Sequence, residues 1–396
     1  MIYSDFNGLR LSRLGFGCMR FAKDPATGEI DQKKVNDMFE LAIKAGVNYF
    51  DTAYPYLDGK SELAMAEALS DYPRDSYFIA DKFPGHSLPG KINNEELFNI
   101  SLKKCRTDYF DFYLMHNVTE WSAACAYERE DLGIIPDLYR LKQEGKIHYL
   151  GYSFHGGPEL LEQWLDKYDG IFDFVQIQCN YLDWTLQDAK KKYELLTEHG
   201  LGVWVMEPNR GGKLANLPES AKEKLAALRP GVSDASFAFR FLQGLPNIKV
   251  ILSGMNEVFQ VEDNLKTFEK YEPLTEEETK ALFEIAEGMK SGVPCTGCRY
   301  CCAGCPMELD IPFLLSVYNS VKVEASIPSF MRLDGLAPEK LPDACIGCGQ
   351  CAHACPQGIA VPTVLEELSE IYKNGPKWSE QVKSRHKAIR EDLGMN

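Results

Sequence analysis

Residues 138–153, with the sequence LYRLKQEGKIHYLGYS, show the local pattern that decides the fold. Apolar residues in Leu138–Gln143 recur at the spacing of three and four that is typical of a helix. Glu144-Gly145 follows, and a glycine at this point is a common end of a helix. Ile147–Ser153 is then a short apolar run with the length of a buried strand. The sequence therefore predicts a helix, a glycine turn and a strand in that order.

The same order recurs along about the first 270 residues. Eight β-then-α units match a (β/α)₈ barrel better than an open doubly wound sheet, and no G-x-G-x-x-G motif follows the first strand. The expected strands are Leu14–Gly17, Val47–Asp51, Tyr77–Lys82, Phe110–His116, Ile147–Ser153, Phe174–Gln178, Val203–Met206 and Val250–Ser253. The expected helices include Gln32–Ala45, Ser61–Leu69, Leu138–Gln143, Leu160–Lys167 and Asp188–Glu198. The fold class is thus α/β.

The overall composition limits the classes of function. Of the 396 residues, 45% are hydrophobic and 26% are charged, which is typical of a globular protein and not of a disordered one. The formal net charge of −15 argues against nucleic-acid binding through phosphate contacts. No apolar run approaches the roughly 20 residues that a membrane span needs. The first residues also lack the pattern of a secretory signal, so we expect a cytoplasmic protein.

Thirteen cysteines are present, and nine of them lie between residues 295 and 355. A reducing compartment argues against disulfides and favours metal binding or redox chemistry. The segments CTGCRYCCAGCP and CIGCGQCAHACP, which begin at Cys295 and Cys345, both have the spacing C-x₂-C-x₂-C-x₃-C-P of [4Fe–4S] ferredoxins. This spacing fits a cluster better than zinc, which favours paired ligands. Cys302 is left over and is expected to be a packed thiol.

Where two such motifs occur, the fourth cysteine of each binds the cluster of the other. We therefore expect one cluster on Cys295, Cys298, Cys301 and Cys355, and a second on Cys345, Cys348, Cys351 and Cys305. Helical patterns follow both motifs, and residues 290–372 resemble the α-helical ferredoxin modules of respiratory iron–sulfur subunits. The predicted organisation is a barrel over residues 1–285 and a mainly α-helical ferredoxin-like domain over residues 286–396. The acidic, helical segment Glu269–Lys290 is expected to connect them.

Four polar residues stand at or beyond the ends of predicted strands, where barrels of this kind place their active sites. Asp51, Lys82 and His116 end the second, third and fourth strands, and Tyr56 lies in the loop after Asp51. A buried lysine favours the phenolate of a nearby tyrosine, and an aspartate keeps the lysine charged. A histidine can hydrogen-bond a substrate carbonyl. Each residue alone could be a helix cap or a satisfied core side chain, but together they indicate a proton-donating site.

These residues lie within a longer resemblance to the aldo-keto reductase family. It covers essentially residues 1–270 and runs through YFDTAYPYLDGKSE (49–62), IADK (79–82), DYFDFYLMH (108–116), EGKIHYLGYS (144–153), VQIQCNY (175–181) and GMNEVFQVEDN (254–264). The order of Asp, Tyr, Lys and His matches the catalytic tetrad of that family. The resemblance implies that Tyr56 is the general acid, that Lys82 and Asp51 tune it, and that His116 orients the carbonyl.

The resemblance also implies part of a nicotinamide site. Ser153 and Gln176 match the positions that bind the carboxamide, and Met206 stands where many members have an aromatic ring. The loop EPNRGGK, with Arg210 and Gly212, and the turn SGMN, with Ser253 and Gly254, follow the last two strands, where barrels often bind phosphate. Members that prefer NADP have a lysine and an arginine where this chain has Gly254 and Gln260, whereas Asn264 is retained. We expect NAD(P)(H), FMN or both in the barrel, with Arg210 either replacing the missing cations or lying in a solvated loop.

Three functions are compatible with these features. The first is a cytoplasmic oxidoreductase that acts on a carbonyl or alcohol, with clusters that pass electrons between the barrel cofactor and a ferredoxin-like partner. Because a hydride carries two electrons and a cluster passes one, this function favours a flavin as converter. The second is a plain NAD(P)H-dependent aldehyde or ketone reductase with structural clusters, and the third is a redox-sensing regulatory protein. The small-molecule substrate, the reaction direction and the oligomeric state are left open.

Overall fold

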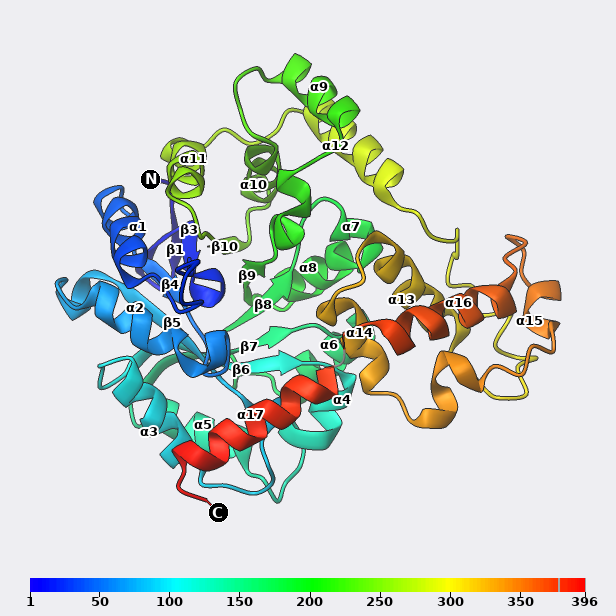
Figure 1. Cartoon of the computed structure of the whole chain (residues 1–396), viewed down its shortest axis with the longest axis horizontal. Coiled ribbons are helices and arrows are strands. Elements are labelled where there is room, and N and C mark those ends of the chain that lie inside the picture. Colours follow the sequence, from blue (N-terminus) through cyan, green and yellow to red (C-terminus); the bar gives the residue numbers. More distant parts are fainter. Residues whose placement is uncertain (377, 396) are drawn as a thin grey trace.

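The first part of the chain forms a closed parallel barrel in the computed structural model, which describes residues 1–376 and 378–395 (Figure 1). The strand order around the barrel is β10-β3-β4-β5-β6-β7-β8-β9. All eight predicted strands are confirmed to within two residues at each end. They are β3 (Leu14–Gly17), β4 (Tyr49–Asp51), β5 (Phe78–Phe83), β6 (Phe110–Val118), β7 (Ile147–Phe154), β8 (Phe174–Gln178), β9 (Gly202–Met206) and β10 (Ile248–Gly254).

Helices alternate with these strands and surround the barrel (Figure 1). The five predicted helices are all present, and two of them begin earlier than the apolar pattern indicated. The surrounding helices are α1 (Gln32–Lys44), α2 (Ser61–Leu69), α3 (Asn94–Lys104), α5 (Ile134–Gln143), α6 (Pro158–Lys167), α8 (Ala189–Glu198), α10 (Asp234–Gln243) and α11 (Val258–Glu269). Shorter or peripheral helices are α4 (Glu120–Ser122), α7 (Asp183–Leu186), α9 (Glu219–Leu228) and α12 (Glu276–Met289).

The inside of the barrel is apolar in its lower part and polar at the carboxyl ends of the strands. Rings from opposite strands meet in the lower part, with the centroids of Phe112 and Trp204 5.5 Å apart. Side chains two positions apart on a strand share a face, so residues above this apolar layer also point inward. Lys82 lies two residues after buried Ala80, and His116 lies two residues after buried Leu114, so each shares the inward face of its strand. The register of the strands thus places polar groups at the barrel mouth.

An antiparallel hairpin of β1 (Tyr3–Phe6) and β2 (Leu9–Ser12) covers the opposite end of the barrel. Phe6 packs edge-on against Trp204, with ring centroids 4.9 Å apart. A Cβ on Gly202 would lie only 3.1 Å from the Phe6 ring, so the hairpin approaches the strands closely. No pattern in the sequence predicts this hairpin. It closes the amino end and leaves the carboxyl end for the site.

The cysteine-rich segment forms a smaller, helical lobe beside the barrel (Figure 1). Its helices are α13 (Ile311–Val323), α14 (Ile327–Asp334), α15 (Gln350–His353) and α16 (Val361–Asn374). The lobe has its own hydrophobic core, which includes Leu314, Leu315, Leu365 and Leu368. The helical patterns predicted after the two cysteine motifs are confirmed by α13 and α16. The acidic segment Glu269–Lys290, which is predicted to connect the barrel with the lobe, contains α12.

The last helix, α17 (Trp378–Asp392), leaves the lobe and packs against the barrel (Figure 1). Ile389 is fully buried in the core of the barrel. Asp392 accepts hydrogen bonds from the Tyr54 hydroxyl and from Lys104, and the Lys104 Nζ lies 2.9 Å from its carboxylate. The end of the predicted C-terminal domain therefore lies on the barrel. Among the described residues, no helix combines the length and apolar character that crossing a bilayer requires.

Candidate active site and cluster sites

Lys82 is the centre of the group at the barrel mouth. It is completely buried, and its Nζ lies 2.5 Å from Asp51 Oδ1. The same ammonium donates to the Thr52 carbonyl at 2.7 Å and to the Tyr56 hydroxyl at 3.2 Å. The lysine therefore links the buried carboxylate to the phenol. The four residues expected from the sequence lie together, on β4, β5, β6 and the turn after β4.

Tyr56 is more accessible than its partners because it lies in a tight turn rather than in a strand. It begins the turn Tyr56–Gly59, in which Leu57 and Asp58 have positive φ angles of 52° and 56°. Non-glycine residues rarely adopt this conformation, so the turn is held by its surroundings. The Tyr56 ring meets the His116 ring edge-on at a centroid distance of 5.5 Å. As a whole residue Tyr56 is half-buried, whereas the other three residues of the group are buried.

The electrostatics of the site favour an ion pair beside a protonated phenol. Burial raises the pKa of Tyr56, and the opposing Lys82 cation does not outweigh this effect. Lys82 thus lowers the pKa of Tyr56 as expected, but burial of the phenolate raises this pKa by more. Burial alone would lower the pKa of Lys82, but Asp51 and Tyr56 reverse the shift and keep the ammonium charged. Tyr56 is therefore protonated at neutral pH, and its general-acid role stays a prediction.

His116 is held as a neutral imidazole. Burial, with the nearby His86 and Lys82, lowers its pKa well below the ordinary value of 6.5. Its backbone carbonyl accepts hydrogen bonds from the Tyr127 hydroxyl at 2.5 Å and faces His86 Nδ1 at 2.8 Å. These contacts fix the backbone at the end of β6. Its ring Nδ1 has no hydrogen-bond partner among the described residues.

Ser153 and Gln176 are brought together by the pairing of β7 and β8, which places them directly opposite each other. Gln176 Nε2 lies 3.7 Å from Met206 Sδ, whereas its buried Oε1 has no partner among the described residues. Ser153 Oγ accepts the backbone N–H of Asn117 at 2.7 Å. An unpaired amide oxygen beside a buried hydroxyl fits the carboxamide of a nicotinamide ring. The assignment of Ser153, Gln176 and Met206 to this ring stays a prediction.

The predicted phosphate-binding residues lie on two neighbouring loops. Gly212 has a φ angle of 99°, which only glycine adopts readily, in the short helical turn Arg210–Ala215 after β9. Gly254 ends β10, and Ser253 accepts a hydrogen bond from Asn264 Nδ2 at 3.0 Å. Gln260 accepts the backbone N–H groups of Asn256 and Glu257, and so caps α11. The capping fixes the turn between β10 and α11.

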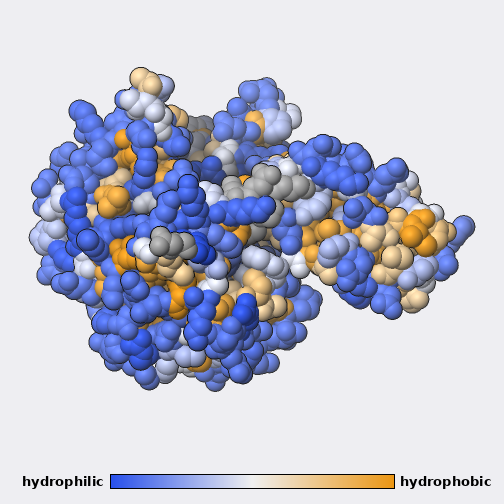
Figure 2. Space-filling model, turned by 60° about the horizontal axis from the view of Figure 1, so that its bottom comes forward, coloured by the Kyte–Doolittle hydropathy of each residue, from blue (hydrophilic) through white to orange (hydrophobic). Residues whose placement is uncertain are grey.

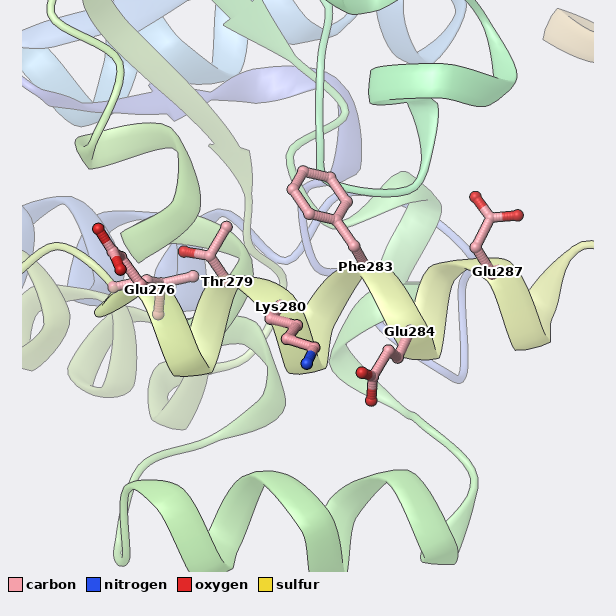
Figure 3. Close-up of a pocket in the computed structure, with 7 residues that line it drawn as sticks. Glu276, Thr279, Lys280, Phe283, Glu284 and Glu287 are labelled. Atoms are coloured by element: carbon pink, nitrogen blue, oxygen red, sulfur yellow. The ribbon is translucent and has the colours of Figure 1, made fainter.

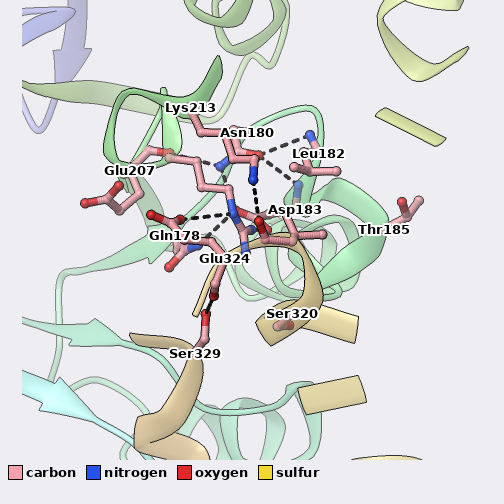
Figure 4. A network of polar contacts seen from close by, with 12 residues as sticks. Gln178, Asn180, Leu182, Asp183, Thr185, Glu207, Lys213, Ser320, Glu324 and Ser329 are labelled. Carbon is pink, nitrogen blue, oxygen red and sulfur yellow. Dashed lines mark hydrogen bonds and ion pairs between the residues drawn. The ribbon is translucent and has the colours of Figure 1, made fainter. Parts of the chain in front are cut away.

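Arg210 turns away from solvent in the structure. It is 3% exposed and forms an ion pair with Asp183, which also accepts hydrogen bonds from Gln178 and Asn180 (Figure 4). Its Nε lies 3.8 Å from Glu324, at the end of α13 in the cysteine-rich lobe. Arg210 thus connects the barrel with that lobe. The alternative of a solvated loop residue is wrong.

Arg20 is the cation that lies between the two loops, and the sequence analysis did not single it out. It follows β3, and its Nη2 is 3.4 Å from Glu207. A Cβ placed on Gly254 would be 3.1 Å from Arg20 Cδ, and one on Gly211 would be 3.6 Å from Arg20 Nη2. The guanidinium therefore spans both expected phosphate loops. The pairing of β3 with β10 is what brings it there.

Two apolar cavities in the lobe are each lined by four cysteines. One contains Cys295, Cys298, Cys301 and Cys355, and the other contains Cys345, Cys348, Cys351 and Cys305. In both, three thiols of one motif meet the last thiol of the other. Four thiols around an apolar cavity fit a [4Fe–4S] cluster, which cysteine thiolates hold. All thirteen cysteines are free of disulfides, and Cys302 lines neither cavity.

A further cavity of about 750 Å³ lies along α12, away from the tetrad and the cysteines (Figure 3). Leu274 and one side of α12 line it, with Phe283 among charged residues such as Lys280 and Glu284. None of the predicted catalytic, cofactor or cluster residues contributes to it. The cavity is therefore not the active site.

The barrel, the tetrad at its mouth and the two four-cysteine cavities define an oxidoreductase fused to an iron–sulfur module. The model of the aldo/keto reductase family matches residues 13–287, and that of a 4Fe-4S dicluster domain matches residues 294–360. The chain therefore belongs to the aldo/keto reductase family and carries a 4Fe-4S dicluster domain.

Known proteins share the barrel part. The uncharacterized oxidoreductase YqkF of Bacillus subtilis (strain 168) is 24% identical in an alignment of 303 positions that covers 69% of this chain and 92% of the relative. The NADH-specific methylglyoxal reductase of Escherichia coli (strain K12) is 26% identical over 52% of this chain and 66% of its own length. A solved aldo-keto reductase from Bacillus halodurans is 24% identical, with a TM-score of 0.56 over 70% of this chain and 93% of that one. These matches support the barrel fold and an oxidoreductase activity.

Proposed function

We propose that the barrel reduces a small carbonyl compound to the alcohol, or catalyses the reverse reaction, with a nicotinamide nucleotide. The contact of Lys82 with both Asp51 and the Tyr56 hydroxyl carries this proposal, because it supplies a proton donor beside a buried cation. A bound nicotinamide nucleotide would supply the hydride for the carbonyl carbon. Tyr56 gives its proton to the carbonyl oxygen, Lys82 stabilises the resulting phenolate, and His116 holds the oxygen. The half-buried phenol regains a proton from solvent.

Ser153 and Gln176 would bind the carboxamide, and the loops around Gly212 and Gly254 would bind the phosphates. The NADH-specific relative of E. coli supports a nicotinamide nucleotide. Nothing in the matched family or in the relatives named above points to FMN, so the flavin expectation receives no support. Arg20 lies between both loops and is the cation that would meet the diphosphate.

The experiment for this activity compares two tyrosine variants in protein purified without oxygen. We expect Tyr56→Phe to lower kcat for reduction of an aldehyde by about 10²- to 10⁴-fold, because a general acid is lost. Tyr72→Phe removes the same hydroxyl from a turn after α2 and should leave kcat unchanged. Equal activity of Tyr56→Phe and wild-type protein would exclude the proposed role of the tetrad.

We also propose that the two clusters transfer electrons rather than only stabilise the lobe, and that the protein works in the cytoplasm. Each cavity has one exposed ligand, Cys298 or Cys348, so each cluster would lie near the surface. Exposed Tyr300 and Ile346 stand beside these ligands, and apolar surface gathers on the lobe (Figure 2). This surface suits exchange with a ferredoxin-like protein. The absence of disulfides among the thirteen cysteines agrees with a reducing compartment.

The electron-transfer role is tested separately from the carbonyl reduction. Dithionite reduces the clusters, excess reductant is removed, and absorbance or electron paramagnetic resonance follows their reoxidation after an oxidised ferredoxin is added. Rapid reoxidation supports transfer to a partner. Addition of the oxidised nicotinamide nucleotide instead of ferredoxin tests transfer within the chain, in which the two reduced clusters together would supply the two electrons of a hydride. Clusters that stay reduced in both cases would leave only the structural role.

A further inference from the structure

The helix that follows the iron–sulfur lobe brings an arginine to the barrel mouth. Arg385 lies on α17, and its Nη1 is 3.2 Å from His86 Nε2. His86 lies in the turn directly after β5, and its ring meets the His116 ring edge-on at 5.0 Å. The His116 ring in turn meets the Tyr56 ring at 5.5 Å. A continuous line of side chains thus joins Arg385 to the proposed proton donor.

The positive charge in this line belongs to Arg385. His86 Nδ1 faces the His116 carbonyl at 2.8 Å, so this nitrogen carries the proton and Nε2 accepts from the guanidinium. Burial, followed by the Arg385 cation, lowers the pKa of His86 well below its ordinary value. His86 is therefore neutral and orients Arg385 without sharing its charge.

A second buried cation lies near the same strand ends. Lys192 on α8 is 3% exposed, and its Nζ lies 3.5 Å from the Gly156 carbonyl. Burial lowers the pKa of Lys192 to about 8, so the amine is mostly charged at neutral pH. Lys192 and Lys82 both act on His155, whose pKa burial and these cations lower to about 4. Carboxylates also act here: Asp51 pairs with Lys82, and Asp58 interacts with Arg385. Three cations, from α17, α8 and β5, nevertheless lie around the barrel mouth, although the whole chain has a net charge of −15.

We propose that Arg385 is a specificity residue that binds a carboxylate carried by the carbonyl substrate. This inference rests on the proposed carbonyl reduction and names its substrate class. The carbonyl oxygen would meet Tyr56 and His116, while the carboxylate meets the guanidinium, whose forked N–H groups match a carboxylate. The C-terminal helix would thereby contribute to the active site of the barrel, which gives the fused chain a role in substrate choice.

The test uses two aldehydes of the same shape, 4-carboxybenzaldehyde and 4-carbamoylbenzaldehyde, with the anaerobically purified full chain. Wild-type protein should have a kcat/KM about 10- to 100-fold higher for the carboxylate, as expected for a charged hydrogen bond. Arg385→Gln should abolish this preference, because kcat/KM falls much more for the carboxylate than for the amide. Arg385→Lys should keep part of it, because the charge remains but the fork is lost.

Lys387→Gln is the matched control, because Lys387 lies on the same helix with a largely exposed side chain 3.7 Å from Glu391. This variant should keep the full preference. Calorimetric binding of 4-(hydroxymethyl)benzoate and its amide gives a second readout that needs no turnover. Arg385-dependent binding of the benzoate without aldehyde reduction would overturn the proposed reaction but not this inference. Turnover without a carboxylate preference, or an equal loss in Lys387→Gln, would overturn the inference alone.

Discussion

The barrel and the iron–sulfur lobe hold their reactive groups in opposite ways. In the barrel, Asp51, Lys82 and His116 are buried near strand ends. Strand pairing fixes the first two, and contacts of its own carbonyl with His86 and Tyr127 fix His116. In the lobe, the cysteines lie mostly on loops, and Cys298 and Cys348 are exposed. A barrel site is therefore ordered by the protein itself, whereas loops with few backbone partners depend on the bonds that a cluster makes.

The two regions also meet directly. Lys213 after β9 donates a hydrogen bond to the Val323 carbonyl at the end of α13, and Arg210 connects Asp183 with Glu324. Helix α17 adds a second contact at the barrel mouth. The barrel and the iron–sulfur lobe are therefore stabilised in different ways but share an interface.

Removal of the clusters should have the largest effect, and only on the lobe. Chelation of iron after mild oxidation leaves four thiols around each cavity without the bonds that close the loops. We expect α13, α15 and α16 to lose protection in hydrogen exchange measured by mass spectrometry, while β5 and β6 keep theirs. Trp121 of the barrel packs against Met331 in α14, so tryptophan fluorescence should report part of this loss as well. Equal loss of protection in barrel and lobe would show that the two fold as one unit.

Lys82→Met should have the next largest effect, and only on the barrel. The variant leaves the buried Asp51 carboxylate without its partner, which costs about 3–5 kcal/mol of unfolding free energy. Urea unfolding followed by tryptophan fluorescence measures this loss, and iron content should stay at the wild-type value.

The double variant Asp51→Leu/Lys82→Met is the control for this prediction. It removes both charges, so most of the stability should return although catalysis does not. A double variant as unstable as Lys82→Met would show that packing around the methionine, and not the unpaired carboxylate, causes the loss.

The contrast between the two regions also explains what the sequence could predict. Strands were predicted because apolar runs of four to seven residues are bounded by turns, and the tetrad was predicted from the ends of those runs. The cysteine spacing is a local signal and needs no tertiary information. The hairpin of β1 and β2 was missed because its apolar side chains are few and its packing on Trp204 is long-range.

Long-range contacts also explain why the sequence could not predict the positions of Arg20 and Arg210. Arg20 and Arg210 both lie in or beside loops that contain glycine. Arg210, however, has a φ angle of 45°, and its side chain turns toward Asp183. Only the closed barrel brings Arg20 to Gly254. Helix α17 is polar along most of its sequence, so its buried residues Val382 and Ile389 gave no detectable signal for its return to the barrel. Arg385 could not be placed without it.

Glu324→Gln tests the interface between the two regions and should have a small effect. Its carboxylate lies 3.8 Å from Arg210 and is 40% exposed, so solvent screens the pair. We expect a loss of at most about 1 kcal/mol in urea unfolding. Arg210 keeps its buried partner Asp183 in this variant. A loss above about 2 kcal/mol would mean that the lobe is a major source of barrel stability, contrary to the separation described above.

The smallest effect is expected from pH, because the barrel buries its titrating groups. Reduction needs protonated Tyr56, and its raised pKa places the loss of this proton above about pH 10 as the pH rises. His116 has a pKa well below 6.5, so it gains a proton only as the pH falls below that value. Under saturating substrate, kcat should therefore change less than about twofold between pH 7 and 9. A falling limb that is centred near pH 8 and disappears in Tyr56→Phe would show that the Lys82 cation outweighs burial in the working enzyme.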